Sequence, residues 1–103
     1  MRRISIGLIL MLLALPASAQ TREDSVTQCA SDDLDLKIGG CTALIQSGQG
    51  SAEVLGQAYA NRGLAYEKKG YLVQAISDYR AALRIEPYDY AASLGLARLN
   101  ATQ

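Results

Sequence analysis

Residues 59–87 carry one spaced pattern of large and small side chains, which constrains the fold more than any other feature of the chain. Its members follow one another in steps of four, three, four, five, four, three and five residues. Most of these steps match the period of an α-helix, so the residues fall on the facing sides of two helices. Tyrosine alternates with glycine or alanine, which lets two antiparallel helices approach closely. The pattern consists of Tyr59, Gly63, Tyr66, Gly70, Ala75, Tyr79, Ala82 and Pro87.

This pattern resembles the signature of the tetratricopeptide repeat, a helix–turn–helix unit of about 34 residues that stacks into solenoids. Every signature position of one repeat, residues 56–89, holds an acceptable residue type. Counting back one unit places a divergent repeat at residues 22–55, and residues 90–103 correspond to the first helix of a further unit. The resemblance therefore implies an all-α fold for residues 20–103: a short solenoid of helical hairpins, about two repeats long, with a C-terminal capping helix.

Turn residues predict where the helices end. Gly70 can adopt the left-handed conformation that closes a helix, so we expect one helix over about residues 51–69. Pro87 disfavours helical geometry in the residue before it, so a second helix is expected over about residues 71–85. A final helix is expected over about residues 89–100. The side chains expected to cover the second hairpin from this last helix are Leu94, Leu96 and Leu99.

Residues 1–19 have the form of a cleaved signal peptide. Two arginines precede an uncharged apolar run at residues 4–15, and residues 17–19 are Ala-Ser-Ala, the small-x-small pattern that signal peptidase cleaves. The apolar run is shorter than the roughly 20 residues of a membrane span. We therefore expect export to the periplasm or the medium, with no stable membrane insertion after cleavage. The alternative is an uncleaved N-terminal anchor.

Charge is distributed unevenly along the expected mature chain. Without the two leader arginines, eight basic and ten acidic residues leave a net charge of −2. Residues 20–55 contain six acidic and two basic residues, with the run Asp32, Asp33 and Asp35, whereas residues 56–103 are mildly basic. Neither half has the basic cluster of a nucleic-acid-binding surface, so no nucleic-acid partner is expected. The acidic run is expected to be a solvated loop.

The two cysteines, Cys29 and Cys41, are expected to form a disulfide in an oxidising compartment. Redox catalysis and zinc binding are weaker alternatives, because the spacing is not CxxC and the chain has no histidine. On the tetratricopeptide resemblance, these cysteines occupy the positions that Gly63 and Ala75 hold one repeat later. In that family the two positions are in close contact between the helices of one repeat. The resemblance thus implies a bond that pins the first hairpin and compensates for its poor match to the consensus.

No constellation of catalytic residues is visible. Without histidine there is no Ser–His or Cys–His pair and no imidazole ligand for a metal. The acidic run is followed by Leu-Lys-Ile, which does not supply the ligands of a calcium loop. We expect a non-enzymatic protein without cofactor or metal. Packing accounts for the tyrosines of the signature, and an aromatic ligand platform formed by Tyr71, Tyr88 and Tyr90 is the alternative for the others.

The resemblance also implies a concave groove that binds a peptide or a partner protein. In the family, groove contacts come from positions of the first helix that lie outside the packing signature. Ala60 stands where members that bind C-terminal carboxylates have a lysine, so a carboxylate clamp is not supported. For Asn61 the alternative is a hydrogen bond between helices. The residues predicted to contact the partner are Gln57, Asn61, Leu64, Glu67 and Lys68.

Two functions remain open at this point. One is an exported protein–protein interaction module, whose groove takes a peptide or another protein. The other is a structural envelope protein that forms homo-oligomers, because so short a solenoid would complete its core by stacking on itself. Burial of both Leu94 and Leu99 in the monomer would remove the motive for self-assembly.

Overall fold

The computed structural model describes residues 21–48 and 50–101, in which all regular structure is helical. The helices are α2 (Arg22–Cys29), α3 (Leu34–Ser47), α4 (Ala52–Lys69), α5 (Leu72–Ile85) and α6 (Tyr90–Ala101). The expected all-α fold of helical hairpins is confirmed. The expected signal peptide, residues 1–19, lies outside the described residues and stays a prediction. No helix in the described part of the chain is both long and apolar enough to span a membrane.

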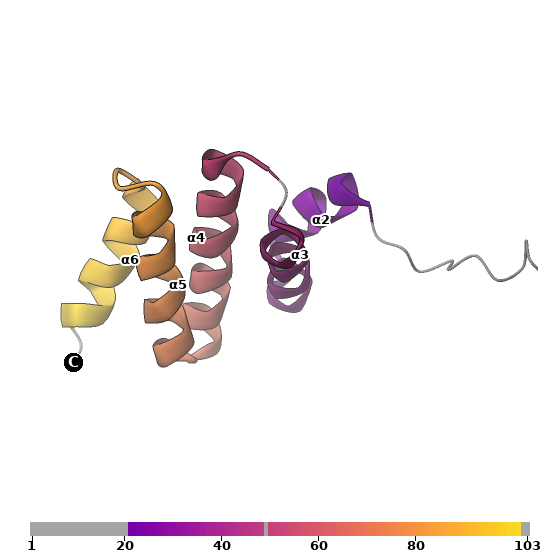
Figure 1. Ribbon diagram of the computed structural model, residues 1–103. Helices are drawn as coiled ribbons and strands as arrows, with labels where there is room; N and C mark the ends of the chain where they lie inside the picture. Colours follow the sequence, from indigo (N-terminus) through magenta and orange to yellow (C-terminus); the bar gives the residue numbers. More distant parts are fainter. Residues whose placement is uncertain (1–20, 49, 102–103) are drawn as a thin grey trace, which may run out of the picture.

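The helices follow one another in a row, and each packs on the next (Figure 1). α2 and α3 form a first hairpin and α4 and α5 a second, while α3 packs on α4 and α6 on α5. In Figure 1, α4, α5 and α6 stand side by side, whereas the first hairpin is turned relative to them. Helix α4 is therefore the element shared by the two parts of the molecule.

Polar and glycine residues set the helix ends. The carboxylate of Asp33 accepts a hydrogen bond from the Leu36 N–H at 3.0 Å and caps α3. Ser51 caps α4 in the same way. Gly48 and Gly70 end α3 and α4 in the left-handed region, with φ values of 62° and 84°. The acidic run is therefore only partly a solvated loop, because one of its members has a structural role.

Tyr79 of α5 is the centre of the larger core, and only 1% of the residue is exposed. A Cβ atom placed on Gly63 of α4 would lie 3.0 Å from its ring, and one on Gly95 of α6 would lie 2.3 Å from it. Both neighbouring helices thus approach the ring where they lack a side chain. Tyr59 and Tyr66 are partly buried against this core. The fully buried members are Ala60, Ala75, Tyr79, Ala82, Ala92 and Leu99.

A smaller core surrounds the disulfide between α2 and α3. The sulfur atoms of Cys29 and Cys41 are 2.06 Å apart and their Cα atoms 4.5 Å apart, which confirms the expected pairing. Leu44 and Ala58 complete this core. Beside it, a Cβ atom on Gly40 would lie 2.6 Å from the backbone nitrogen of Cys29. The first hairpin is thus held by a covalent bond and a very close backbone approach.

The last helix covers the second hairpin incompletely. Leu99 is 4% exposed and belongs to the core, and Leu96 is partly buried against it. Leu94 faces the same hairpin but is 40% exposed, so it covers the hairpin only in part. The reason is that Leu94 lies over a hollow between α4 and α6.

Candidate partner-binding groove

A hollow of about 200 Å³ lies between α4 and α6, beside the ring of Tyr79. Two alanines, one from each helix, leave the space between them. Apolar groups form most of its wall, and an amide and a guanidinium add polar groups. This composition is typical of a site that takes an apolar side chain and orients it with a few hydrogen bonds. The lining residues are Ala60, Asn61, Leu64, Tyr79, Ala91, Leu94 and Arg98.

Asn61 links the groove to the first hairpin. Its side-chain Nδ2 donates to the backbone carbonyl of Cys29 at 3.4 Å and lies 3.9 Å from the sulfur of the same residue. The hydrogen bond between helices, weighed as an alternative role, is therefore present. Asn61 also lines the groove, so its hydrogen bond to Cys29 helps to hold one groove side chain in place.

Glu67 connects α4 to both of the following helices. Its carboxylate accepts a 2.7 Å hydrogen bond from the Tyr79 hydroxyl and two 3.0 Å hydrogen bonds from the guanidinium of Arg98. The Arg98 hydrogen bond, with a contribution from Tyr79, lowers the pKa of Glu67 below its ordinary value of 4.5. Burial, reinforced by the hydrogen bond to Glu67, raises the pKa of Tyr79 above its ordinary range. Glu67 is therefore engaged within the molecule, where it binds two residues of the groove lining, Tyr79 and Arg98.

The structure brings together two of the five side chains predicted to contact a partner. Asn61 and Leu64 line the groove. Glu67 lies next to it in the hydrogen-bonded group just described, and Gln57 and Lys68 are exposed on α4 outside its lining. That any of these residues contacts a partner stays a prediction.

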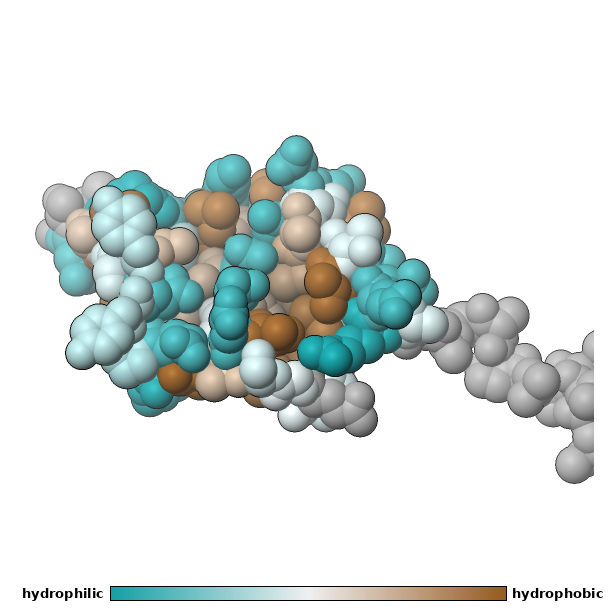
Figure 2. All heavy atoms as spheres, turned by 90° about the horizontal axis from the view of Figure 1, so that it is seen from above, coloured by the Kyte–Doolittle hydropathy of each residue, from teal (hydrophilic) through white to brown (hydrophobic). Residues whose placement is uncertain are grey.

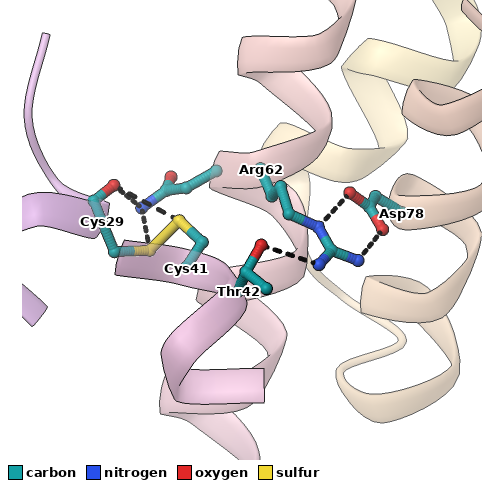
Figure 3. The surroundings of a disulfide bond; sticks show 6 residues. Cys29, Cys41, Thr42, Arg62 and Asp78 are labelled. Carbon is teal, nitrogen blue, oxygen red and sulfur yellow. Dashed lines mark hydrogen bonds and ion pairs between the residues drawn. A yellow bond between two sulfur atoms is a disulfide. The ribbon is translucent and has the colours of Figure 1, made fainter. Parts of the chain in front are cut away.

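A buried ion pair beside the groove was missed by the sequence interpretation. The guanidinium of Arg62 donates to both carboxylate oxygens of Asp78 at 2.8 Å, and to the Thr42 hydroxyl at 3.1 Å (Figure 3). Asp78 is only 4% exposed, and its hydrogen bond raises the pKa of Arg62. The Arg62 guanidinium carbon also lies 5.7 Å and 5.8 Å from the ring centroids of Tyr59 and Tyr66.

This group ties α3, α4 and α5 together through one side chain. The available signal in the sequence was an acidic residue next to Tyr79, on the face of α5 that the spacing pattern assigned to the core. A charged side chain at such a position requires a partner. The group positions α4, and hence the groove, without lining it.

Comparison with protein-family models, with curated proteins and with solved structures gave no match. The fold and the site by themselves describe a small all-α protein of helical hairpins with an apolar groove between α4 and α6. In the described residues, no group of three or more histidine, cysteine, aspartate or glutamate side chains is arranged to hold a metal ion.

Proposed function

We propose that this protein is an exported, non-enzymatic interaction module of the tetratricopeptide type, which binds a peptide or partner protein in the groove between α4 and α6. The observation that carries the proposal is the apolar hollow itself, lined by Asn61 and Leu64. These two residues were selected from the repeat register alone, and they meet at a hollow that α6 completes.

The small size of the groove limits the free energy of binding that it can contribute. Burying one aliphatic side chain there would stabilise a complex by about 1.5–3 kcal/mol. A micromolar complex needs about 8 kcal/mol, so the partner must make further contacts. Gln57 and Lys68 are exposed on the same helix as Asn61 and Leu64 and offer polar contacts for an extended segment. The proposed ligand is therefore a segment with one aliphatic anchor in the hollow and polar groups along α4.

A photo-crosslinking amino acid tests the groove directly. It is placed at Leu94, which lines the hollow, and in a matched control at Gln46, an exposed position on α3. We expect a defined adduct with another protein from position 94 in cells and none from position 46. A Leu64→Glu change in the same protein should abolish the adduct while the far-ultraviolet circular dichroism stays helical. Equal adducts from both positions, or an adduct that survives the Leu64 change, would overturn the groove assignment.

The export that we propose has its own test. The disulfide between Cys29 and Cys41 is compatible with an oxidising compartment. Mass spectrometry of the protein recovered from the periplasm or medium should show a chain that begins at Gln20 and lacks free thiols. A full-length chain retained with the cytoplasm would contradict export.

Self-assembly remains the second candidate, because α6 leaves apolar surface open. Leu99 is buried, but Leu94 is 40% exposed and Tyr90 75% exposed. The crosslinking experiment separates the two functions: an adduct of twice the chain mass from position 94 would show a second copy in the groove, and an adduct of another mass would show a different partner.

A further inference from the structure

The outer face of α5 carries a stripe of residues that are all exposed except Ile76, which is partly buried against the larger core. Its members recur at helical spacing and surround a shallow hollow of about 370 Å³. We call them the basic stripe. Val73 is 80% exposed, and Arg80 and Arg84 are also exposed. The members of the basic stripe are Val73, Ile76, Ser77, Arg80 and Arg84.

The charge of the basic stripe is not balanced within the molecule. Arg80 and Arg84 are one helical turn apart, a spacing at which like charges destabilise a helix. The one acidic residue of α5, Asp78, is buried and paired with Arg62. None of the ion pairs between described residues involves either arginine of the stripe. The stripe thus combines positive charge with an exposed aliphatic group, which suits an acidic surface that presents an apolar side chain.

The same chain presents such a surface where the turn after α2 leads into the first residues of α3. We call residues 32–36 the acidic turn. Asp32 is exposed and forms none of the ion pairs of the described residues, and the side chain of Asp35 is 83% exposed although it pairs with Lys69 at 2.6 Å. Leu36 follows and is 49% exposed. The acidic turn therefore presents acidic groups beside an apolar side chain, which complements the positive charge and the exposed aliphatic group of the basic stripe.

The acidic turn is not packed against the basic stripe of its own chain. α5 packs against α4 and α6, and neither α2 nor α3 makes a helix–helix contact with it. Seen from above, the molecule presents apolar groups among polar side chains on the face in view (Figure 2). The exposed apolar side chains of the basic stripe and the acidic turn are Val73 and Leu36, so association through paired charge and one or two apolar contacts fits them better than a broad hydrophobic interface.

We propose that the acidic turn of one copy docks on the basic stripe of a second copy. The two surfaces differ, so the contact is head-to-tail and generates a ring or an open chain of molecules. Exposed charge pairs contribute little each and are screened by salt, so the association is weak and salt-sensitive. The contact does not involve the groove between α4 and α6, and it does not depend on the proposed function. An anionic membrane is the less fitting occupant, because stable attachment needs more than two cationic groups and one exposed valine.

A charge-swap experiment on the oxidised chain without residues 1–19 tests this contact. The stripe variant carries Arg80→Glu and Arg84→Glu. The turn variant carries Asp32→Lys and Leu36→Lys, and it leaves the cap Asp33 and the ion-paired Asp35 unchanged. Arg22→Glu serves as the control, because Arg22 is an exposed cation on α2 outside both surfaces and outside the groove lining. Sedimentation velocity at low salt, over a range of concentrations, reports the association.

The wild-type chain should associate, and each variant alone should associate about tenfold more weakly. A mixture of the two variants should form a one-to-one complex, because each keeps one intact surface. Arg22→Glu should behave as wild type, and about 1 M salt should abolish the association. If a double variant unfolds by circular dichroism, Arg84→Gln alone should weaken association in the same direction.

Several outcomes would overturn the proposal. These are a wild-type chain that stays monomeric at millimolar concentration, variants that associate like wild type, and a mixture that forms no complex. Binding of a monomeric wild-type chain to phosphatidylglycerol vesicles, lost in the stripe variant, would assign the stripe to lipid instead. The Leu94 adduct with another protein would survive the stripe variant in every case, which separates this test from that of the groove.

Discussion

The two hairpins solve the same packing problem by different means. In the first, α2 has only 8 residues, and a disulfide joins it to α3. In the second, α4 has 18 residues, and the buried ring of Tyr79 fills the space between α4, α5 and α6. A short helix buries too little apolar surface to hold its partner, so a covalent bond holds the first hairpin, whereas a packed aromatic residue holds the second.

Helix α4 joins the two parts through adjacent polar side chains. Asn61 reaches back to Cys29, and Arg62 reaches Thr42 of the first hairpin and Asp78 of the second. The comparison therefore predicts two regions of different stability that communicate through one helix. The experiments below test this picture in order of expected effect.

Removing the ring of Tyr79 should have the largest effect. Tyr79→Ala empties the centre of the larger core and should lower the free energy of unfolding by about 3–5 kcal/mol, measured by urea denaturation. Tyr88→Ala is the control, because Tyr88 is 96% exposed, and it should change stability by less than about 0.5 kcal/mol. Similar effects from the two changes would show that the second hairpin does not depend on this ring.

Breaking the buried ion pair should come next. Arg62→Met leaves the carboxylate of Asp78 buried without its partner and should cost about 3 kcal/mol in a urea titration. The estimate is taken from the low end of the range for buried pairs, because the Arg62 side chain is 18% exposed. Adding Asp78→Leu should restore most of the loss, since both charges are then gone. No recovery in the double variant would mean that Arg62 acts through its contacts with Thr42 and the tyrosine rings.

Two neighbouring glycines offer a matched pair in the first hairpin. Gly40→Ala forces a Cβ atom to within 2.6 Å of the backbone of Cys29 and should destabilise the protein by about 1–3 kcal/mol. Gly39→Ala meets no atom within 4 Å and should stabilise α3 by up to about 1 kcal/mol. Thermal unfolding of the two variants should therefore shift in opposite directions. Equal shifts would contradict the close approach of α2 and α3 at this point.

The smallest effect concerns pH and Glu67. Its folded-state pKa lies below the ordinary 4.5, so the unfolded chain takes up the proton first as the pH falls. The stabilisation is complete above 4.5 and is lost as the pH falls through the folded-state value. Because the Arg98 side chain is 50% exposed, the contribution should be below about 1 kcal/mol. The melting temperatures of wild type and Glu67→Gln should differ at neutral pH and converge in acid, and a constant difference would refute the link.

Much of the backbone could be predicted from the sequence because its signals are local. Gly70 and Pro87 mark helix ends within a few residues, and two cysteines in a chain expected to be exported indicated a disulfide. The contacts between helices were not predictable in the same way. Periodicity identifies the face on which Asp78 or Glu67 lies, but not the side chain that meets it from a helix elsewhere in the chain. The role of Gly95 against Tyr79 was missed for the same reason.

The candidate groove was predictable only in part. Asn61 and Leu64 follow from the register of one helix, whereas Leu94 and Arg98 depend on how α6 packs across it. Glu67 was predicted to face a partner, but it binds Arg98 and Tyr79 because both groups converge on it from neighbouring helices. A helix register thus predicts one wall of a groove, and the opposite wall requires the tertiary structure.

Hydrogen–deuterium exchange of the oxidised and the reduced protein tests the difference between the two regions most directly. The disulfide closes a loop with a sequence separation of 12, and its loss should cost about 3 kcal/mol on the chain-entropy estimate. On reduction, the amides of α2 and α3 should lose protection, while those of α4, α5 and α6 keep most of theirs. Equal loss of protection in all the described helices would show a single cooperative unit, and unchanged protection in α2 would show that packing alone holds the first hairpin; either result would contradict the account.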